Sequence, residues 1–226
     1  MNKSYEVEIK SLLGSKAAAD ALKDNLKRKY PEVKLIGTGK QLNHYFIAPK
    51  DISLLVKNVL PLISADKKES LDHILNHGSK ISLRTRDADG KVILVLKASV
   101  GDDSSANGVK RIEFEATVPK TLAELDKMLL DSGASYQAKW SREREEYKTD
   151  NMHICIDRNA GYGYLAEFEK VVQNELDVDK AHADLLNAMK ALGADELPQD
   201  RLERMFAHYN SHWMDYYGTE KTFNIA

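Results

Sequence analysis

The sequence predicts an α+β fold in which eight antiparallel strands form a sandwich or a closed barrel, with helices between them. Eight segments alternate apolar and polar residues with the period of two that is typical of β-strands. Turn residues such as Asp89-Gly90 lie between consecutive strand segments, which favours hairpins and therefore antiparallel pairing. Further segments carry apolar residues at helical spacing, which predicts amphipathic helices.

The expected strands are residues 4–10, 34–47, 79–86, 91–98, 109–118, 134–148, 152–157 and 163–172. We expect the second strand to break at Gly37–Gly39, because glycine weakens a strand interior. The later strand pairs are joined by Asp150-Asn151 and by Asn159–Gly161, which are turn-forming residues.

The expected helices are residues 15–29, 51–76, 119–132, 178–192 and 198–217. The third of them begins with Thr121 as its cap and Glu124 three residues later, the spacing of a capping box. The long stretch 51–76 is amphipathic, so we expect one helix that packs on the outside of the strands.

The size of the chain predicts one domain. A chain of 226 residues with 42% hydrophobic and 30% charged residues can bury one sizeable core. We expect the main domain at residues 1–195 and a helical extension at 196–226 that packs on the same domain. The single cysteine, Cys155, excludes an internal disulfide, and we expect it to be a small apolar strand residue rather than a nucleophile.

Charge and hydropathy limit the partners. The net charge is −2 and the pI is near 6.4, so no global basic field draws the chain to nucleic acid or to an anionic membrane. No segment has the apolar length needed to cross a bilayer, and the N-terminus does not resemble an export signal. We expect a soluble, cytoplasmic protein with no nucleic-acid or membrane partner.

The functional signal is that most expected strands have one ionic face. The ionic residues are Glu6, Glu8 and Lys10, then Arg84 and Arg86, then Lys97, then Arg111, Glu113 and Glu115, then Arg142 and Arg144, then Asp157, and finally Glu167 and Glu169. A solvated face explains any one strand, but few of these faces carry the Thr, Ser and Gln usual on solvated strands.

If the helices cover the apolar faces, these ionic faces turn inward around a polar lumen. Carboxylates and cations in one lumen are costly to desolvate unless they surround metal ions and a multiply charged ligand. A triphosphate with divalent cations meets both demands, because Arg and Lys bind its oxygens and carboxylates hold the metal.

The order of these residues resembles the CYTH superfamily, the triphosphate tunnel metalloenzymes. EVEIK at 6–10 resembles the family's ExExK signature, and QLNHYF, LRTR, LVLKAS, REREEY, ICID and GYGYLAEFE follow in the family's order. The similarity covers residues 4–172. It implies an eight-stranded antiparallel β-barrel with helices packed outside, as in class IV adenylyl cyclases, thiamine triphosphatases and bacterial inorganic triphosphatases.

Two departures from the family pattern stand out. Asn43 and His44 occupy positions where many members carry Asp and Thr, and 50–78 is a longer helical insertion than compact members have. His44 is either a general base or a histidine bonded to its neighbours near the barrel mouth. The aromatic tail residues, including Tyr209 and Tyr216, either stack on a base or thiamine ring or pack the last helix down. The insertion and the resemblance leave a homodimer open.

The resemblance also implies residue roles. Mg²⁺ or Mn²⁺ would be held by Glu6, Glu8, Asp157, Glu167 and Glu169. The triphosphate oxygens would be bound by Lys10, Arg84, Arg86, Lys97, Arg111, Arg142 and Arg144. Glu113 and Glu115 would support the basic set, and catalysis would depend on Glu6, Glu8, Lys10 and Glu169.

We expect a metal-dependent hydrolase whose small-molecule substrate is inorganic triphosphate, cleaved to pyrophosphate and phosphate, because no nucleoside-specific motif is visible. The alternatives are class IV adenylyl cyclase-like conversion of ATP to cyclic AMP, a thiamine triphosphatase, and a noncatalytic polyphosphate or nucleotide sensor.

Overall fold

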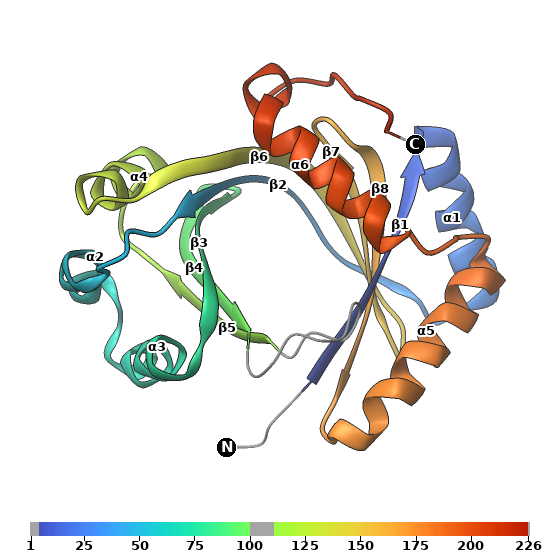
Figure 1. The fold of residues 1–226 in the computed structure, drawn as a ribbon. Helices are drawn as coiled ribbons and strands as arrows, with labels where there is room; N and C mark the ends of the chain where they lie inside the picture. The colour runs from blue at the N-terminus through green and yellow to red at the C-terminus, as the bar shows by residue number, and fades with distance from the viewer. Residues whose placement is uncertain (1–4, 100–110, 226) are drawn as a thin grey trace. The chain divides into compact units, whose positions relative to one another are not determined.

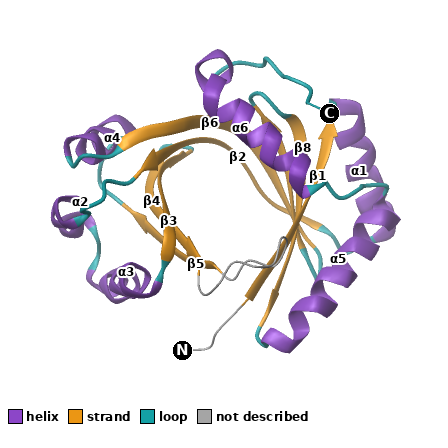
Figure 2. Cartoon of the chain, in the orientation of Figure 1, coloured by secondary structure: helices purple, strands orange, loops and turns teal. Residues whose placement is uncertain are grey.

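The structure, a computed structural model, describes residues 5–99 and 111–225. Within them, eight strands are hydrogen-bonded in the order β1-β8-β7-β6-β2-β3-β4-β5, and six α-helices accompany the strands (Figure 2). Paired strands run antiparallel. The predicted α+β fold with an eight-stranded antiparallel sheet is therefore confirmed. β1 and β5 are the two ends of this order, and closure into a barrel stays a prediction.

The chain divides into two compact units, which we describe separately. Among the described residues, unit 1 contains 5–40 and 142–225, and unit 2 contains 41–99 and 111–141. The side chains of Ser79, Lys80, Ser99, Arg111, Ile112 and Glu175 lie outside the description.

Unit 1 is built on strands at the two ends of the sequence. Its elements are β1 (Tyr5–Gly14), β7 (His153–Asn159), β8 (Gly163–Val172), α1 (Lys16–Lys29), α5 (Val178–Leu192), α6 (Gln199–Tyr216), the first half of β2 (Lys34–Ile47) and the second half of β6 (Ser135–Lys148). Helices α1 and α5 contact β1 and β8 (Figure 1). Val7, Ile9 and Phe168 are buried in one cluster with Leu22 of α1 and Leu185 of α5.

Unit 2 is built on the central strands. Its elements are β3 (Ser79–Ala88), β4 (Lys91–Ser99), β5 (Arg111–Thr117), α2 (Ser53–Val59), α3 (Ala65–His77), α4 (Leu122–Asp131), a 3₁₀ turn (Leu60–Leu62) and the remaining halves of β2 and β6. Helix α3 contacts β4 and β5, and α4 contacts β3 and α2. Leu83, Leu94 and Phe114 form a second cluster with Ile74 and Leu125.

The expectation of one core was wrong, because most of the buried apolar side chains in the described residues form two clusters and each cluster contains residues of one unit only. Helices α1 and α5 pack on strands of unit 1, and α3 and α4 pack on strands of unit 2. Burial of apolar area is favourable wherever it occurs, so the hydrophobic effect does not require one contiguous core.

Three local predictions can be compared with the structure. The single helix expected at 51–76 is broken, because Pro61 in the 3₁₀ turn has no amide hydrogen for a continuous helix. The break expected in β2 is absent, since β2 runs unbroken through Gly37. The capping box of α4 is confirmed: the Glu124 amide donates to Thr121 Oγ1 at 3.2 Å, and the Thr121 amide donates to Glu124 Oε2 at 2.8 Å.

The C-terminal segment belongs to unit 1. The Leu197 amide donates to the Lys10 carbonyl of β1 at 2.8 Å, and the Phe223 amide donates to the Gly161 carbonyl at 2.8 Å. The Tyr209 side chain is fully buried and its ring lies 5.9 Å from the ring of Tyr162. At Tyr209, the aromatic tail therefore packs the last helix down. The boundary proposed between residues 195 and 196 stays a prediction.

Candidate functional site

The ionic face of unit 1 is assembled by strand register. Directly opposite residues of antiparallel strands point to the same face of a sheet. Glu8 on β1 lies opposite Glu169 on β8, and Lys10 lies opposite Glu167. Glu6 continues this face two residues before Glu8. The structure thus brings together Glu6, Glu8, Lys10, Glu167 and Glu169, all predicted from the sequence.

Glu167 is a carboxylate with several cations around it. Arg144 donates from Nη2 to Glu167 Oε2 at 2.5 Å, and the Lys10 ammonium lies 3.5 Å from Glu167 Oε1 and also pairs with Glu8. Burial alone would raise the pKa of the Glu167 carboxyl, but the charges of Lys10, Arg144 and Arg142 outweigh burial and hold this pKa well below its usual range. Glu167 is therefore a carboxylate near neutral pH.

Asp157 on β7 fixes two arginines of β6. Its carboxylate is completely buried and accepts hydrogen bonds from Arg144 Nε and Nη2, each at 2.7 Å, and from Arg142 Nη1 at 2.9 Å. Two-pronged contacts of this kind fix the plane of a guanidinium group. Asp157 was predicted as a metal ligand; here both of its oxygens accept from arginines, and the metal role stays a prediction.

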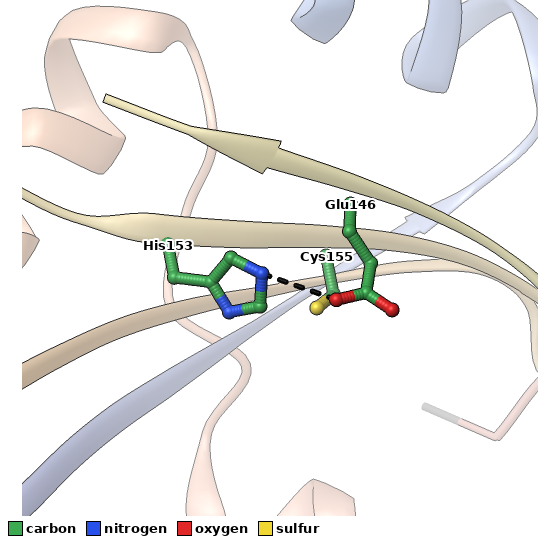
Figure 3. Close-up of side chains that lie close together, drawn as sticks. All are labelled: Glu146, His153 and Cys155. Atoms are coloured by element: carbon green, nitrogen blue, oxygen red, sulfur yellow. Dashed lines mark ion pairs between the residues drawn. The ribbon is translucent and has the colours of Figure 1, made fainter. Parts of the chain in front are cut away.

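Three further side chains of unit 1 lie close together on the same ionic face. The sequence analysis did not predict them as a group of possible ligands. Glu146 of β6 lies opposite Cys155 of β7, and His153 lies two residues before Cys155 and opposite Glu169 (Figure 3). The signal that could have found them is His153 and Cys155 at a spacing of two on one strand, which puts both on the same face. Their partner Glu146 depends on the register between β6 and β7.

The ionic face of unit 2 pairs its cations with acceptors on neighbouring strands. Arg86 of β3 donates from Nε to Asn43 Oδ1 at 2.7 Å and from Nη1 to Glu115 Oε1 at 2.8 Å. Lys97 of β4 lies 3.0 Å from Glu113 Oε2 of β5. The predicted supporting residues Glu113 and Glu115 therefore lie beside predicted phosphate-binding cations.

Arg84 lies on the same ionic face of unit 2, where it contacts an aromatic ring. Its guanidinium carbon lies 4.4 Å from the centre of the Tyr45 ring, a cation–π distance, and its Nε donates to Ser82 at 3.2 Å. Arg111 begins β5, but its side chain lies outside the description.

His44 lies on the opposite, helix-facing side of unit 2. Its Nδ1 lies 2.6 Å from Asp126 Oδ2 of α4, and Asp126 also accepts hydrogen bonds from Thr85 at 2.6 Å and from Tyr136 at 2.7 Å. His44, Thr85 and Asp126 are buried. Of the two alternatives for His44, the structure shows the histidine that is bonded to its neighbours.

Arginine and lysine side chains can bind phosphate oxygens and carboxylates can bind hard cations, so these ionic faces have the chemistry to bind a polyanion together with cations. The family is shown directly: this chain belongs to the CYTH family, because the CYTH domain model matches residues 4–201.

Solved structures share the fold. The PH1012 protein of Pyrococcus horikoshii OT3 matches with a TM-score of 0.61 and 18% identity, covering 85% of this chain and 94% of its own. A candidate adenylate cyclase from Vibrio parahaemolyticus matches with a TM-score of 0.58 and 14% identity, covering 90% and 98%. HpAC1 from Hippeastrum, a candidate adenylyl cyclase reported to have a dominant triphosphatase activity, matches with a TM-score of 0.50 and 16% identity, covering 90% and 96%.

No match was found among curated proteins. In the part of the chain that the structure describes, none of the helices has the length and hydropathy required to traverse a membrane.

Proposed function

We propose that this protein is a divalent-metal-dependent hydrolase that cleaves inorganic triphosphate to pyrophosphate and phosphate. The observation that carries the proposal is the face of unit 1, where Glu8 and Glu169 lie directly opposite each other beside Lys10 and the Asp157-bound arginines. Membership of the CYTH family and the triphosphatase activity reported for HpAC1 support the same class of reaction.

The carboxylates of this face fit a hard divalent cation. Like charges directly opposite on a sheet destabilise it, and a cation between Glu8 and Glu169 would relieve that repulsion. Mg²⁺ and Mn²⁺ prefer oxygen ligands of this kind. Glu6, Glu8 and Glu169 would hold the ion first, and Glu167 and Asp157 would join through lone pairs that their cationic partners do not use. The bound ion would polarise phosphoryl oxygens and lower the pKa of a bound water.

The cations of the chain would bind and orient the triphosphate. Arg142 and Arg144 are held in place by Asp157, so little side-chain freedom is lost when they donate to phosphate oxygens. Lys10 adds a compact charge on the same face. In unit 2, considered by itself, phosphate oxygens would be bound by Arg84, Arg86, Lys97 and Arg111, with Glu113 and Glu115 orienting their neighbours.

Conversion of ATP to cyclic AMP is the second candidate activity, because a candidate adenylate cyclase is among the similar structures. The assay measures phosphate release from tripolyphosphate, thiamine triphosphate and ATP, together with formation of cyclic AMP, with Mg²⁺, Mn²⁺ or no added metal. Phosphate release from tripolyphosphate in excess over all other products supports our proposal. Cyclic AMP as the main product supports the cyclase, and binding without turnover supports the sensor.

Two variants test the proposal, one on the ionic face of each unit. We expect Glu8→Gln and Arg86→Ala each to lower turnover of tripolyphosphate by about 100-fold or more, the cost of removing one preorganised charge from an active site. Asp131→Asn, on the exposed end of α4, is the matched control and should retain the wild-type rate. Wild-type turnover in both test variants, with circular dichroism unchanged, would falsify the proposal.

A further inference from the structure

Strands β6 and β7 bring a carboxylate, an imidazole and a thiol together. The ligand atoms of Glu146, His153 and Cys155 all lie within 4.8 Å of one another, and His153 Nε2 is 3.2 Å from Glu146 Oε2 (Figure 3). We infer that these three residues form a binding site for a soft divalent cation of the zinc class, next to the all-oxygen site of the proposed hydrolase, with Glu169 between the two.

The spacing of the three ligand atoms is close to that of a zinc site. Bonds of about 2.0–2.3 Å to oxygen, nitrogen and sulfur place the ligand atoms of a tetrahedral zinc ion about 3.3–3.8 Å apart. The Glu146–His153 pair, at 3.2 Å, already has nearly this separation. Small rotations of the half-exposed Glu146 and His153 side chains would bring both toward the buried thiol.

The imidazole of His153 is oriented as in many metal sites. Its Nδ1 lies 3.6 Å from Glu169 Oε2, while its Nε2 points toward Glu146. Nε2 is buried and, within the described residues, makes no hydrogen bond of good geometry. A histidine that ligates through one nitrogen commonly donates its other N–H to a carboxylate, which fixes the tautomer and the ring plane. Glu169 occupies the place of that carboxylate.

The donor set selects the kind of cation. Thiolate and imidazole ligands favour zinc and other borderline or soft ions, whereas Mg²⁺ and Mn²⁺ prefer oxygen ligands. Three protein ligands leave the fourth position of a tetrahedral ion to water. The site would therefore bind zinc in the presence of an excess of Mg²⁺.

Coordination requires the thiolate of Cys155. On binding, the S–H bond breaks, a metal–sulfur bond forms, and the proton passes to solvent. Affinity should therefore increase as the pH rises.

The test uses Co²⁺ as a coloured substitute for zinc with the full chain, under reducing conditions and excess Mg²⁺. Because Cys155 is the chain's single cysteine, a thiolate-to-cobalt absorption band in the near ultraviolet can arise from this residue alone. We expect a band that saturates at one Co²⁺ per chain and disappears when Zn²⁺ is added. Cys155→Ala should abolish it, and His153→Gln and Glu146→Gln should each weaken Co²⁺ binding by about 10-fold or more.

The control removes another histidine pair. His73 and His77 lie one turn apart on α3 with ring centres 4.6 Å apart, so His73→Gln/His77→Gln removes a competing surface site while leaving the cysteine band intact. No band at saturating Co²⁺ would overturn the inference. A band with unchanged affinity in both His153→Gln and Glu146→Gln would overturn it too, because the thiol would then bind cobalt without the other two ligands. Neither readout depends on hydrolysis, so failure here is distinguishable from failure of the proposed function.

Discussion

Among the described residues, each unit buries one aspartate: Asp157 on strand β7 of unit 1 and Asp126 on helix α4 of unit 2. Asp157 in unit 1 lies on the ionic face and holds two charged guanidinium groups. Asp126 in unit 2 lies on the helix-facing side and accepts from Thr85 and Tyr136, with His44 also in contact. The first carboxylate positions residues of the candidate site, whereas the second fastens α4 to its strands.

The comparison teaches that burial alone does not identify a functional carboxylate. Both aspartates are among the buried polar residues, and both have several hydrogen-bond partners. The difference lies in the partners of each aspartate. Arg142 and Arg144 are charged and can extend toward a ligand, whereas Thr85 and Tyr136 are neutral and complete a packed interface. The predictions below test whether Asp157 positions residues of the candidate site while Asp126 only stabilises the fold.

The largest expected effect is at Asp157. Asp157→Asn leaves the largely buried Arg142 and Arg144 without the charge of Asp157, and only Arg144 keeps Glu167 as a carboxylate partner described above, so we expect a loss of about 3–5 kcal/mol in the free energy of unfolding. Urea denaturation followed by circular dichroism measures this loss. The folded fraction should also show a raised KM for tripolyphosphate. A loss below about 1 kcal/mol would contradict the positioning role.

A smaller effect is expected at Asp126. Asp126→Asn removes a charge-assisted acceptor from three partners, the buried His44 and Thr85 and the half-buried Tyr136, and we expect destabilisation of about 1–3 kcal/mol. Turnover per folded molecule should stay at the wild-type value, as it should in the exposed control Asp131→Asn. Reduced turnover with an unchanged free energy of unfolding would contradict the structural role that we assign to Asp126.

The loss of stability at acid pH should show that Glu167 is ion-paired in the folded protein. Its pKa is lower in the folded protein than in the unfolded chain, so its stabilising contribution is present above the unfolded value of about 4.3 and is lost as the pH falls. The free energy of unfolding of the wild type should therefore decrease between neutral and acid pH more steeply than that of Glu167→Gln. Equal slopes for the two proteins would contradict this assignment.

The smallest expected effect is at Glu115 in unit 2. The Glu115 side chain is 40% exposed and pairs with Arg86, so Glu115→Gln should change the free energy of unfolding by less than about 1 kcal/mol. The same urea measurement serves for this variant. If the free energy of unfolding fell as much as in Asp157→Asn, the ion pairs of the two ionic faces would contribute equally to stability, contrary to our comparison.

Much of the fold could be predicted because strand periodicity is a local property. The alternation around Val7 and Ile9 predicted which residues of β1 are buried, and Asp89 and Gly90 adopt the positive φ values of 51° and 87° that a tight hairpin requires. The helix break at Pro61 was also readable locally, and it was overlooked because the apolar spacing continues on both sides of it.

The partners within the site could be predicted less well, because they depend on register between strands distant in the sequence. That Asp157 would bind Arg142 and Arg144, and that Glu146 would lie opposite Cys155, follows from how β6 pairs with β7. A shift of one residue in that pairing would move every side chain to the other face. No single strand contains this information.

The hydrogen bond from the Leu197 amide to the Lys10 carbonyl has a consequence for aggregation. β1, which carries Glu8 and Lys10, is an end of the hydrogen-bonded strand order, and exposed edge strands are where chains associate wrongly. A segment far from β1 in the sequence covers part of that edge. A variant without Leu197 and the residues around it would leave Glu8 and Lys10 on a strand open to aggregation.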